Sequence, residues 1–546
     1  MSDAFIVCSG LSFSWPDATP VFRDLSFSVG GGRTGLVAPN GAGKSTLLRL
    51  IAGEYRPARG SLTVTGTPGY LPQTLPLTGD MTVAEVLGIA PVLRALDAIE
   101  SGDTDERHFT TIGDDWDVEE RTRAQLARLG LGELSLTRRL DTLSGGRIVS
   151  LGLAAQLLKR PSVLLLDEPT NNLDTDARRA LYDVLDTFDS RHGCLLLVSH
   201  DRELLDRVDR IAELDSGELR FHGGDFTAYE EALRGERAAA ERTVRHAEQE
   251  VKREKREMQQ ARERAARRQN QAARNVSNAG LPKILAGARK RRAQESAGRA
   301  DETHGSRVDA ARARLDEAGR AVRDDDALAL DLPATRVPAG RTVFSGARMR
   351  VSLGERPVFA GQGVDLTIRG PERIALTGSN GAGKSTLLRL LSGALTPEEG
   401  AEVRRAEGRV AQLSQRLDLL DPDMTVAGSL AAAAPAMPEA ERMNLLARFL
   451  FRGQRTRLRI GALSGGELLR ATLACVLFAQ PAPQLLLLDE PTNNLDLPGV
   501  ARLEGALLAY QGAFVVVSHD ERFLREIGVD RRLRLDDGRL TDLGAP

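Results

Sequence analysis

The chain has 546 residues, more than one hydrophobic core normally supports, so its length predicts two or more domains. Hydrophobic residues make up 41% and charged residues 27%, a composition that is typical of globular proteins and excludes a disordered chain. The net charge is −2, and the three cysteines (Cys8, Cys194 and Cys475) lie too far apart in sequence to predict a metal cluster or a disulfide framework.

The N-terminus begins Met-Ser-Asp-Ala-Phe-Ile-Val-Cys, without a basic region followed by a long apolar run, so we expect no secretory signal. Residues 471–488 form the longest apolar stretch, but two glutamines and two prolines interrupt it. This stretch predicts a helix followed by a strand and not a membrane span. We therefore expect a cytoplasmic protein without a stable membrane partner.

Four motifs occur twice in the same order, which indicates a duplicated domain. They are Asn-Gly-Ala-Gly-Lys-Ser-Thr-Leu-Leu-Arg-Leu at 40–50 and 380–390, Leu-Ser-Gly-Gly at 143–146 and 463–466, Leu-Leu-Leu-Asp-Glu-Pro-Thr-Asn-Asn-Leu-Asp at 164–174 and 486–496, and Val-Ser-His-Asp at 198–201 and 517–520. Each copy alternates apolar runs with helical stretches, which is typical of an α/β domain with a parallel sheet. We expect the two domains at 1–230 and 341–546, with a linker at 231–340.

The first repeated motif predicts a phosphate-binding loop, because it follows an apolar strand and precedes an apolar helix. Lys44 and Lys384 are expected to reach the outer phosphates of ATP, and Ser45 and Ser385 to offer hydroxyls to Mg²⁺. The first copy has Ala38 where the second has a glycine; we expect ATP binding to survive, although a positive φ at Ala38 would be strained. The remaining residues expected to surround the phosphates are Asn40, Gly41, Gly43, Thr46, Gly378, Asn380, Gly381, Gly383 and Thr386.

Two adjacent carboxylates end an apolar run in each copy. We expect Asp167 and Asp489 to hold Mg²⁺, and Glu168 and Glu490 to act as general bases on the attacking water. A single acidic pair usually lies in a solvated loop. Here a phosphate loop precedes each pair and a histidine follows it, which favours ATP hydrolysis.

The composition changes abruptly between the copies. Residues 231–330 contain no aromatic residue, and residues 251–300 carry fifteen Lys or Arg against four Glu, a net charge of +11. Small apolar residues recur at a spacing of four and three, which predicts two long antiparallel helices with a tip at 278–282. Solubility alone explains charged faces on exposed helices, but this excess of positive charge favours a polyanion. Without aromatics to stack on bases, we expect phosphate contacts to folded RNA. The apolar positions are Ala240, Val244, Ala247, Val251, Met258, Ala261 and Ala265, then Val308, Ala311, Leu315, Ala318 and Val322.

Together, these motifs resemble the ATP-binding cassette superfamily over both halves of the chain. The resemblance implies that each Leu-Ser-Gly-Gly motif begins a helix that caps the γ-phosphate held by the other cassette, which suits the N–H groups and dipole of a helix start. Two composite sites follow. One joins Lys44, Ser45, Gln73, Asp167, Glu168 and His200 to Ser464, Gly465 and Gly466, and the other joins Lys384, Ser385, Gln415, Asp489, Glu490 and His519 to Ser144, Gly145 and Gly146.

The same resemblance implies further roles. Gln73 and Gln415 match the glutamine that senses Mg²⁺ and the attacking water, so both also count as metal-site residues. His200 and His519 match the switch histidine; a lone histidine is more often a core residue, but the repeated Val-Ser-His-Asp context favours the switch.

Three departures from the family pattern, at Ala38, Leu353 and Arg147, predict two non-equivalent sites. Trp15 matches the aromatic residue that stacks on adenine, unless it is plain core packing, whereas the second half has Leu353, which would stack less well. Arg147 follows Leu-Ser-Gly-Gly where Gln or Glu is commoner.

Two cassettes in one chain, without membrane spans and with a basic helical linker, resemble the ABC-F family, whose members act on ribosomes. Three segments support this resemblance: Pro-Thr-Asn-Asn-Leu-Asp in both halves, with Asp174 and Asp496 at the cassette seam, residues 223–229, and the linker run 282–294. The resemblance implies a monomeric clamp that ATP closes and hydrolysis reopens, with the linker on ribosomal RNA and tRNA. It implies protection from antibiotics or tuning of elongation, and about 22 extra residues near 97–117 permit a short arm.

The tandem cassettes leave two other functions open. A nucleotide-binding subunit of a drug or metabolite exporter is the alternative, although linkers in such subunits are seldom long, helical and basic; copurification with a membrane-spanning partner would favour it. A role in DNA metabolism is disfavoured by the lack of zinc-ligand cysteines, and a DNA-independent ATPase rate would argue further against it.

Overall fold

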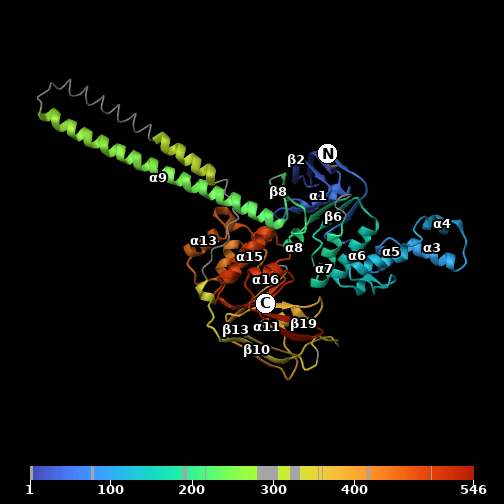
Figure 1. The fold of residues 1–546 in the computed structure, drawn as a ribbon. Helices are drawn as coiled ribbons and strands as arrows, with labels where there is room; N and C mark the ends of the chain where they lie inside the picture. The colour runs from blue at the N-terminus through green and yellow to red at the C-terminus, as the bar shows by residue number, and fades with distance from the viewer. Residues whose placement is uncertain are drawn as a thin grey trace. The chain divides into compact units, whose positions relative to one another are not determined.

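A computed structural model describes residues 4–75, 79–171, 173–188, 193–215, 217–278, 305–319, 332–354, 356–359, 361–406, 408–414, 418–493 and 495–545. The chain divides into two compact units. One unit comprises Met1–Phe226 with Ala327–Pro546, and the other comprises Thr227–Asp326. The first unit holds both cassettes, and the second holds the helical linker (Figure 1).

The first cassette is built on two sheets. A six-stranded sheet has the order β5-β6-β7-β3-β8-β9, parallel except for the last pair, and a three-stranded antiparallel sheet has the order β2-β1-β4. The strands are β1 (Ala4–Ser14), β2 (Pro20–Gly30), β3 (Gly32–Val37), β4 (Arg59–Val64), β5 (Pro68–Leu71), β6 (Val163–Asp167), β7 (Cys194–Val198), β8 (Arg210–Asp215) and β9 (Glu218–Gly223). The helices are α1 (Lys44–Ile51), α2 (Val83–Val86), α3 (Ala90–Glu100), α4 (Glu106–Ile112), α5 (Val118–Arg128), η1 (Leu140–Thr142), α6 (Gly145–Leu158), α7 (Thr175–Asp186) and α8 (Arg202–Leu205).

The second cassette repeats this plan. Its six-stranded sheet has the order β16-β17-β18-β14-β19-β20, and β13-β10-β15 form its antiparallel sheet. Its strands are β10 (Thr342–Met349), β11 (Ser352–Leu353), β12 (Arg356–Pro357), β13 (Val364–Arg369), β14 (Arg373–Thr377), β15 (Glu402–Arg405), β16 (Arg409–Leu413), β17 (Pro483–Asp489), β18 (Ala513–Val517), β19 (Arg531–Asp536) and β20 (Arg539–Gly544). Its helices are η2 (Pro333–Thr335), α11 (Lys384–Ser392), α12 (Val426–Ala433), α13 (Glu439–Arg448), η3 (Gly453–Arg457), η4 (Ile460–Ala462), α14 (Gly465–Leu477), α15 (Leu497–Ala509) and α16 (Glu521–Glu526).

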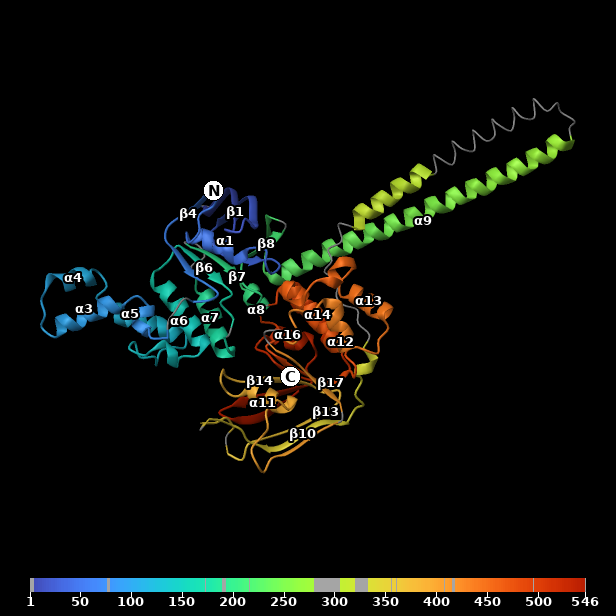
Figure 2. The same ribbon diagram turned by 180° about the vertical axis from the view of Figure 1, so that it is seen from behind.

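The apolar runs form the central strands of both sheets. Every residue of β6 and β7 is buried, as is every residue of β18, because helices cover both faces of a parallel sheet (Figure 2). The predicted α/β fold with two tandem cassettes is therefore confirmed. Leu332 and Val337 already pack in the core of the second cassette. The expected boundary at 340/341 stays a prediction.

The three motifs of each site come together because their strands are neighbours. In the order β6-β7-β3, β6 ends at Asp167, β7 leads to His200, and β3 leads to the phosphate loop. These parallel strands end at one edge of the sheet, where α/β proteins bind ligands. β17, β18 and β14 repeat the arrangement in the second cassette.

The extra residues of the first cassette form a short helical arm. Helices α3 and α4 pack against each other, and α3 also packs against α5. The predicted short arm is thus present, and Phe109 and Trp116 are exposed on it, with their ring centroids 6.1 Å apart.

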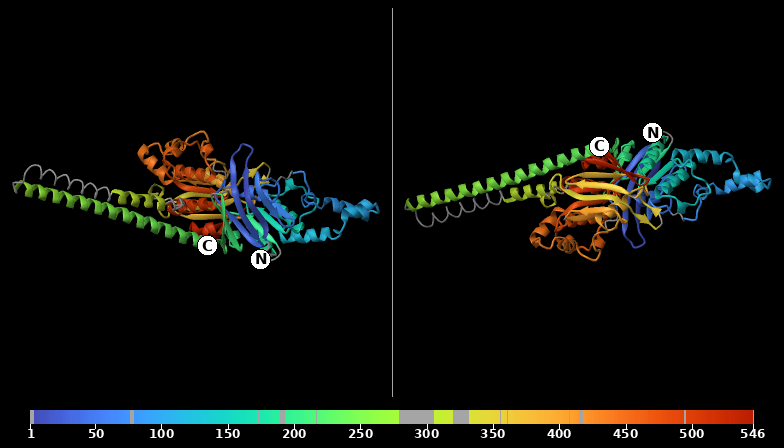
Figure 3. Two further views of the ribbon diagram at one scale, coloured as in Figure 1. Left: turned by 90° about the horizontal axis from the view of Figure 1, so that it is seen from above. Right: turned by 90° about the horizontal axis from the view of Figure 1, so that it is seen from below.

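The linker contains the predicted long helix. Helix α9 (Phe226–Asn278) has 53 residues, which corresponds to about 80 Å, and it is drawn as one uninterrupted helix in Figure 3. Residues 305–319 are also helical. The apolar stripe packs as expected, with Ala247 and Val251 buried on α9 and Val308 and Ala311 buried on the returning segment. Its positions Ala265 and Val322, the tip beyond residue 278 and the run 282–294 lie outside the described residues or side chains.

Candidate active sites

The two phosphate loops have the same backbone turn before their helices. Gly43 and Gly383 precede α1 and α11 with φ of 99° and 102°, the left-handed conformation that glycine adopts without strain. A Cβ on Gly43 would lie 2.6 Å from Val21 Cγ1, and one on Gly383 would lie 2.6 Å from Val358 Cγ1. Both loops therefore require glycine at this position.

The loop lysines point back along their own loops. Lys44 Nζ donates to the Ala38 carbonyl oxygen at 2.8 Å, and Lys384 Nζ donates to the Gly378 carbonyl oxygen at 2.6 Å. Gly378 has φ of 138°, and a Cβ there would lie 2.0 Å from the Leu535 carbonyl oxygen. Ala38 is not among the positive-φ residues, so the strain anticipated at Ala38 does not arise.

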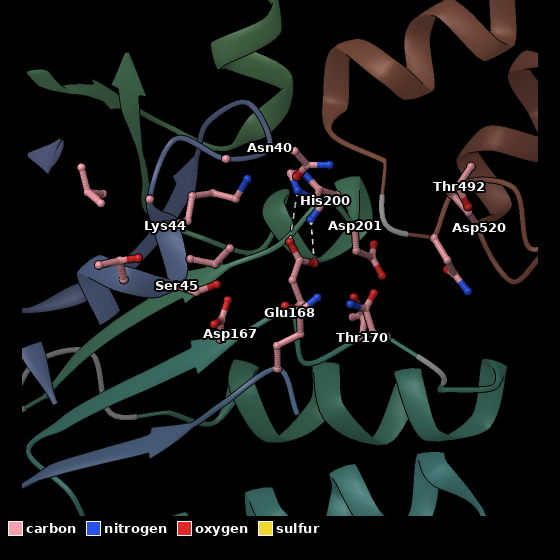
Figure 4. A pocket seen from close by; sticks show the side chains of 18 of the residues that line it. Asn40, Lys44, Ser45, Asp167, Glu168, Thr170, His200, Asp201, Thr492 and Asp520 are labelled. Carbon is pink, nitrogen blue, oxygen red and sulfur yellow. Dashed lines mark hydrogen bonds and ion pairs between the residues drawn. The ribbon is translucent and has the colours of Figure 1, made fainter. Parts of the chain in front are cut away.

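In the first site the carboxylate pair faces the histidine. His200 Nε2 lies 3.2 Å from Glu168 Oε1, and the His200 backbone N–H donates to Glu168 Oε2 at 3.3 Å (Figure 4). Glu168 has φ of 52°, and Glu490 repeats this left-handed conformation with φ of 45°. Non-glycine residues rarely adopt it, and such strain is concentrated at functional sites.

Burial controls the protonation of this pair. It raises the pKa of Glu168 to about 8, against the opposing effect of the Lys44 ammonium. Burial, together with the nearby Lys44 ammonium, lowers the pKa of His200 to about 3. His200 is therefore neutral at physiological pH. A glutamate whose pKa lies near neutrality accepts a proton more readily than an ordinary one, as a general base must.

The first site fits a magnesium ion. Both carboxylate oxygens of Asp167 are buried and have no hydrogen-bond partner among the described residues. Burial raises the pKa of Asp167, and the Ser45 hydroxyl is the largest of the influences that lower it. A carboxylate beside a hydroxyl suits Mg²⁺, which takes few protein ligands together with nucleotide phosphates and water. Among the described residues no group of three or more His, Cys, Asp or Glu could hold a metal ion by itself. A bound Mg²⁺ would neutralise the negative charge that develops on the phosphates of ATP during hydrolysis.

The second site repeats this geometry. His519 Nε2 lies 3.4 Å from Glu490 Oε1 and 3.4 Å from Lys384 Nζ. Burial raises the pKa of Glu490 to about 7 and lowers that of His519 to about 4. Asp489 lines the same cavity. The expected partner Gln415 lies outside the described residues.

Residues of the opposite cassette line both sites. The second site is a cavity of about 570 Å³ in which Ser144, Gly145 and Gly146 face the second phosphate loop. The first site is a cavity of about 500 Å³ lined across the seam by Thr492, Asn493 and Asp520. Ser464, Gly465 and Gly466 do not line it, although a Cβ on Gly465 would lie 3.9 Å from Asn40 Nδ2. All the remaining predicted residues of the first site line its cavity: Trp15, Asn40, Gly41, Gly43, Lys44, Ser45, Thr46, Gln73, Asp167, Glu168 and His200.

Direct polar contacts join the cassettes. The Asn40 backbone N–H donates to Asp496 Oδ2 at 3.1 Å, which places this aspartate at the seam. The Arg202 guanidinium donates two hydrogen bonds to the Glu504 carboxylate, at 2.9 and 3.2 Å, and neither side chain is more than 13% exposed. A buried bidentate pair of this kind fixes orientation at an interface.

Trp15 borders the first site but is not isolated. It packs edge-on against Phe13 and Tyr55, with ring centroids 5.5 and 5.6 Å away. One edge therefore belongs to an aromatic cluster while the residue still lines the cavity. The Leu353 side chain of the second cassette lies outside those described.

The helices that begin at the two Leu-Ser-Gly-Gly motifs differ at their first turn. Glu467 accepts hydrogen bonds from the Ser464 N–H at 3.0 Å and from the Ser464 hydroxyl at 2.8 Å, which completes a capping box on α14. Ser144 makes no side-chain cap on α6, and Arg147 in the third position has no acceptor with which to bond the Ser144 N–H.

Several lining residues were not predicted. Asn171 and Asn493 line the sites, and they belong to the repeated Pro-Thr-Asn-Asn-Leu-Asp motif, so the repeat itself was a signal. Arg178 lines both cavities, yet the matching position in the second copy is Val500, so the repeat gave no indication of it.

Comparisons with known proteins agree with this geometry. The sequence profile of the family described as "ABC transporter" matches residues 22–171 and 362–493. The tylosin resistance ATP-binding protein TlrC of Streptomyces fradiae is 34% identical over 549 residues, which cover 96% of each protein. The chain belongs to the ABC-F family of ATP-binding cassette ATPases. The energy-dependent translational throttle protein EttA of Escherichia coli O6:H1, another ABC-F protein, is 30% identical and covers 96% of this chain and 91% of its own.

A solved structure shows the same fold. The archaeal ribosome recycling factor aABCE1, crystallised with the ribosomal stalk protein aP1, aligns with a TM-score of 0.58 over 98% of this chain and 90% of its own, at 20% identity. This chain therefore has the tandem-cassette fold. Its two ATP-binding cassettes and its ABC-F relatives show that it hydrolyses ATP. No helix in the described part of the chain is long and apolar enough to cross a membrane.

Proposed function

We propose that this ABC-F ATPase binds the ribosome in its ATP-closed state and protects it from an antibiotic. ATP in the second cavity would contact Lys384 from one cassette and Ser144 from the other, so ATP binding would join the cassettes. Hydrolysis, with Glu168 and Glu490 as general bases, would then release them.

One observation carries the closure: the glycine-led start of α6 lines the same cavity as the second phosphate loop. N–H groups at a helix start attract an anion, so the γ-phosphate would be held from both sides. For the first site we propose the same role for Ser464, Gly465 and Gly466, supported by the approach of Gly465 to Asn40.

The linker supports a nucleic-acid partner. Its net charge of +11 over residues 251–300 suits phosphates, and its lack of aromatics disfavours base stacking. Lys252, Lys255 and Arg256 are exposed on α9. We propose that the linker contacts ribosomal RNA and tRNA, and that the protein acts as a monomer in the cytoplasm.

Ribosome cosedimentation tests the first half of this proposal. The E168Q/E490Q variant should stay bound in the presence of ATP, because its cassettes close and cannot reopen. The K44A/K384A variant, which should not hold ATP, is the matched control. Equal cosedimentation of the two variants, or none by E168Q/E490Q, would contradict ATP-dependent binding.

Drug susceptibility tests the second half. The name of the relative TlrC refers to tylosin, so a sensitive strain that expresses this protein should tolerate more tylosin than one that expresses E168Q/E490Q. Lincosamides, streptogramins and pleuromutilins should be tested beside it. Unchanged susceptibility to all of them would replace protection by a role in elongation.

A charge-reversal variant tests the linker. K252E/K255E/R256E should weaken ribosome binding and reduce its salt dependence, because phosphate contacts release counterions. An R56E/R59E/R179E variant, which reverses three charges on the first cassette, is the control. Equal losses in the two variants would contradict a specific role of α9.

A further inference from the structure

Arg178 occupies a position that no other cation shares among the described residues. It lines both ATP cavities, although it belongs to helix α7 of the first cassette. Its side chain is only 11% exposed. Burying a guanidinium costs free energy unless partners compensate it, so the contacts of Arg178 indicate what it is placed to hold.

Those contacts join the two histidine loops, 198–201 and 517–520. Arg178 Nη1 donates to Asp201 Oδ2 at 3.2 Å, next to His200 of the first site. The same nitrogen donates to the His519 carbonyl oxygen at 3.4 Å, in the second site. One guanidinium therefore links Asp201, the neighbour of the first-site histidine, to the second-site histidine His519.

Two further hydrogen bonds fix this link. The Tyr182 hydroxyl donates to Asp201 Oδ2 at 2.7 Å, which holds the acceptor of Arg178 in place. The Thr175 hydroxyl lies 3.2 Å from His519 Nδ1, so α7 contacts the second-site histidine at its ring as well as at its backbone. A displacement of His519 would therefore shift or break its hydrogen bonds with Thr175 and Arg178 on α7.

Only one of the two matching helices makes this link. In the repeat Asp174 matches Asp496, so Thr175 matches Leu497 and Arg178 matches Val500. Neither leucine nor valine has a side-chain hydrogen-bonding group. Helix α15 therefore cannot make the same contacts with the first histidine loop.

Electrostatics agree with this placement. Among the charged groups around Arg178, Asp201 acts from the first cassette, and Glu490 and Asp520 act from the second. Of the charges that lower the pKa of Glu490, Arg178 has the largest influence. A neutral side chain at this position would leave buried carboxylates of both sites without their common cation.

We propose that Arg178 is a positioning residue that couples the two ATP sites, because it ties the histidine loop of each cassette to the other. Binding of nucleotide at the second site would set His519 and, through Arg178, the loop that carries Asp201 and His200. The inference rests on the proposed ATP sites but not on the ribosome.

Intrinsic fluorescence can read the first site separately. The chain has two tryptophans, of which Trp15 lines the first cavity and Trp116 is 53% exposed on the arm. In a W116F chain, titration with β,γ-methylene-ATP and Mg²⁺ reports on Trp15 without hydrolysis. The K384A substitution then disables the second site. A Trp15 response in the parent tests the ATP site itself, separately from the coupling.

Disabling the second site should raise the half-saturating nucleotide concentration at Trp15 by at least about 5-fold when Arg178 is present. The coupling ratio is the half-saturating nucleotide concentration with K384A divided by that without it. In R178M this ratio should fall to near one. R178K should also reduce the ratio to near one, because a lysine ammonium cannot replace the planar guanidinium that bonds both loops. Since R178K keeps the buried positive charge, it serves as the test variant if R178M does not fold. R179M is the matched control, since Arg179 is 73% exposed, and it should keep the full ratio.

A ratio that R178M or R178K leaves at the parental value would overturn the proposal. So would a parental chain in which K384A has no effect at Trp15 although Trp15 responds to nucleotide. Loss of the ratio in R179M would likewise overturn it, because the effect would then not belong to Arg178.

Discussion

The two cassettes share identical loops of eleven residues but surround them differently. The first has Trp15 beside its cavity, Ala38 at the start of its loop and Arg147 on its helix α6. The second has Gly378 and Glu467 at the positions that match the last two. Duplicated motifs thus supply the chemistry of both sites, whereas neighbouring residues make the sites unequal.

The largest expected effect tests whether both sites hydrolyse ATP. E168Q and E490Q should each lower turnover at their own site by a factor of about 10² to 10⁴, because a general base contributes that much. ATP binding should persist, since neither glutamate belongs to the phosphate loop. Steady-state phosphate release by each single variant and by the double variant checks this. Full activity in one single variant would show that only the other site turns over.

Exchanging alanine and glycine at positions 38 and 378 should affect the two phosphate loops to different extents. G378A places a Cβ 2.0 Å from the Leu535 carbonyl oxygen at φ of 138°, so we expect a cost of about 3 kcal/mol and loss of ATP from the second site. The reverse change, A38G, should cost only about 0.4–1 kcal/mol through the flexibility of the unfolded chain. Thermal unfolding with and without ATP measures both. Similar effects of the two variants would contradict the difference in loop backbone.

Trp15 should contribute several-fold to nucleotide affinity at the first site. W15A should weaken nucleotide binding there by about 2- to 10-fold, since aromatic stacking contributes about 0.5–1.5 kcal/mol. W15F should retain most of the affinity. Equilibrium binding of a labelled ATP to K384A chains measures the first site alone. Unchanged affinity in W15A would reduce Trp15 to a member of its cluster with Phe13 and Tyr55.

The smallest expected effect concerns the helix caps. R147E should create on α6 the capping box that Ser464 and Glu467 form on α14, and should stabilise the first cassette by about 0.5–1 kcal/mol. E467R should destabilise the second cassette by a similar amount. Urea unfolding of each variant measures the change. Destabilisation by R147E would mean that Arg147 has a partner role which outweighs the missing cap.

Much of the fold followed from the sequence because its signals are local and repeated. The apolar runs of β6 and β17 and the long stripe of α9 needed no tertiary information. The convergence of Asp167, His200 and Lys44 also followed, since each comes directly after a strand of the same parallel sheet.

The features that the sequence did not reveal depend on contacts between the cassettes. Arg178 has no counterpart in the repeat, and only the packing of α7 brings it to His519. The backbone of Ala38 could not be foreseen either, because φ at that position depends on the surrounding fold. The left-handed conformation of Glu168 and Glu490 also has no signature in the side chains themselves.

The most direct test of the account is the position of each Leu-Ser-Gly-Gly motif relative to the nucleotide of the other cassette. A structure of the E168Q/E490Q variant with ATP and Mg²⁺ would measure the distance from the Ser144 and Ser464 hydroxyls to the γ-phosphate oxygens. We expect both hydroxyls within hydrogen-bonding distance, each on the ATP held by the opposite phosphate loop. Serines remote from both γ-phosphates would contradict the composite sites and the clamp built on them.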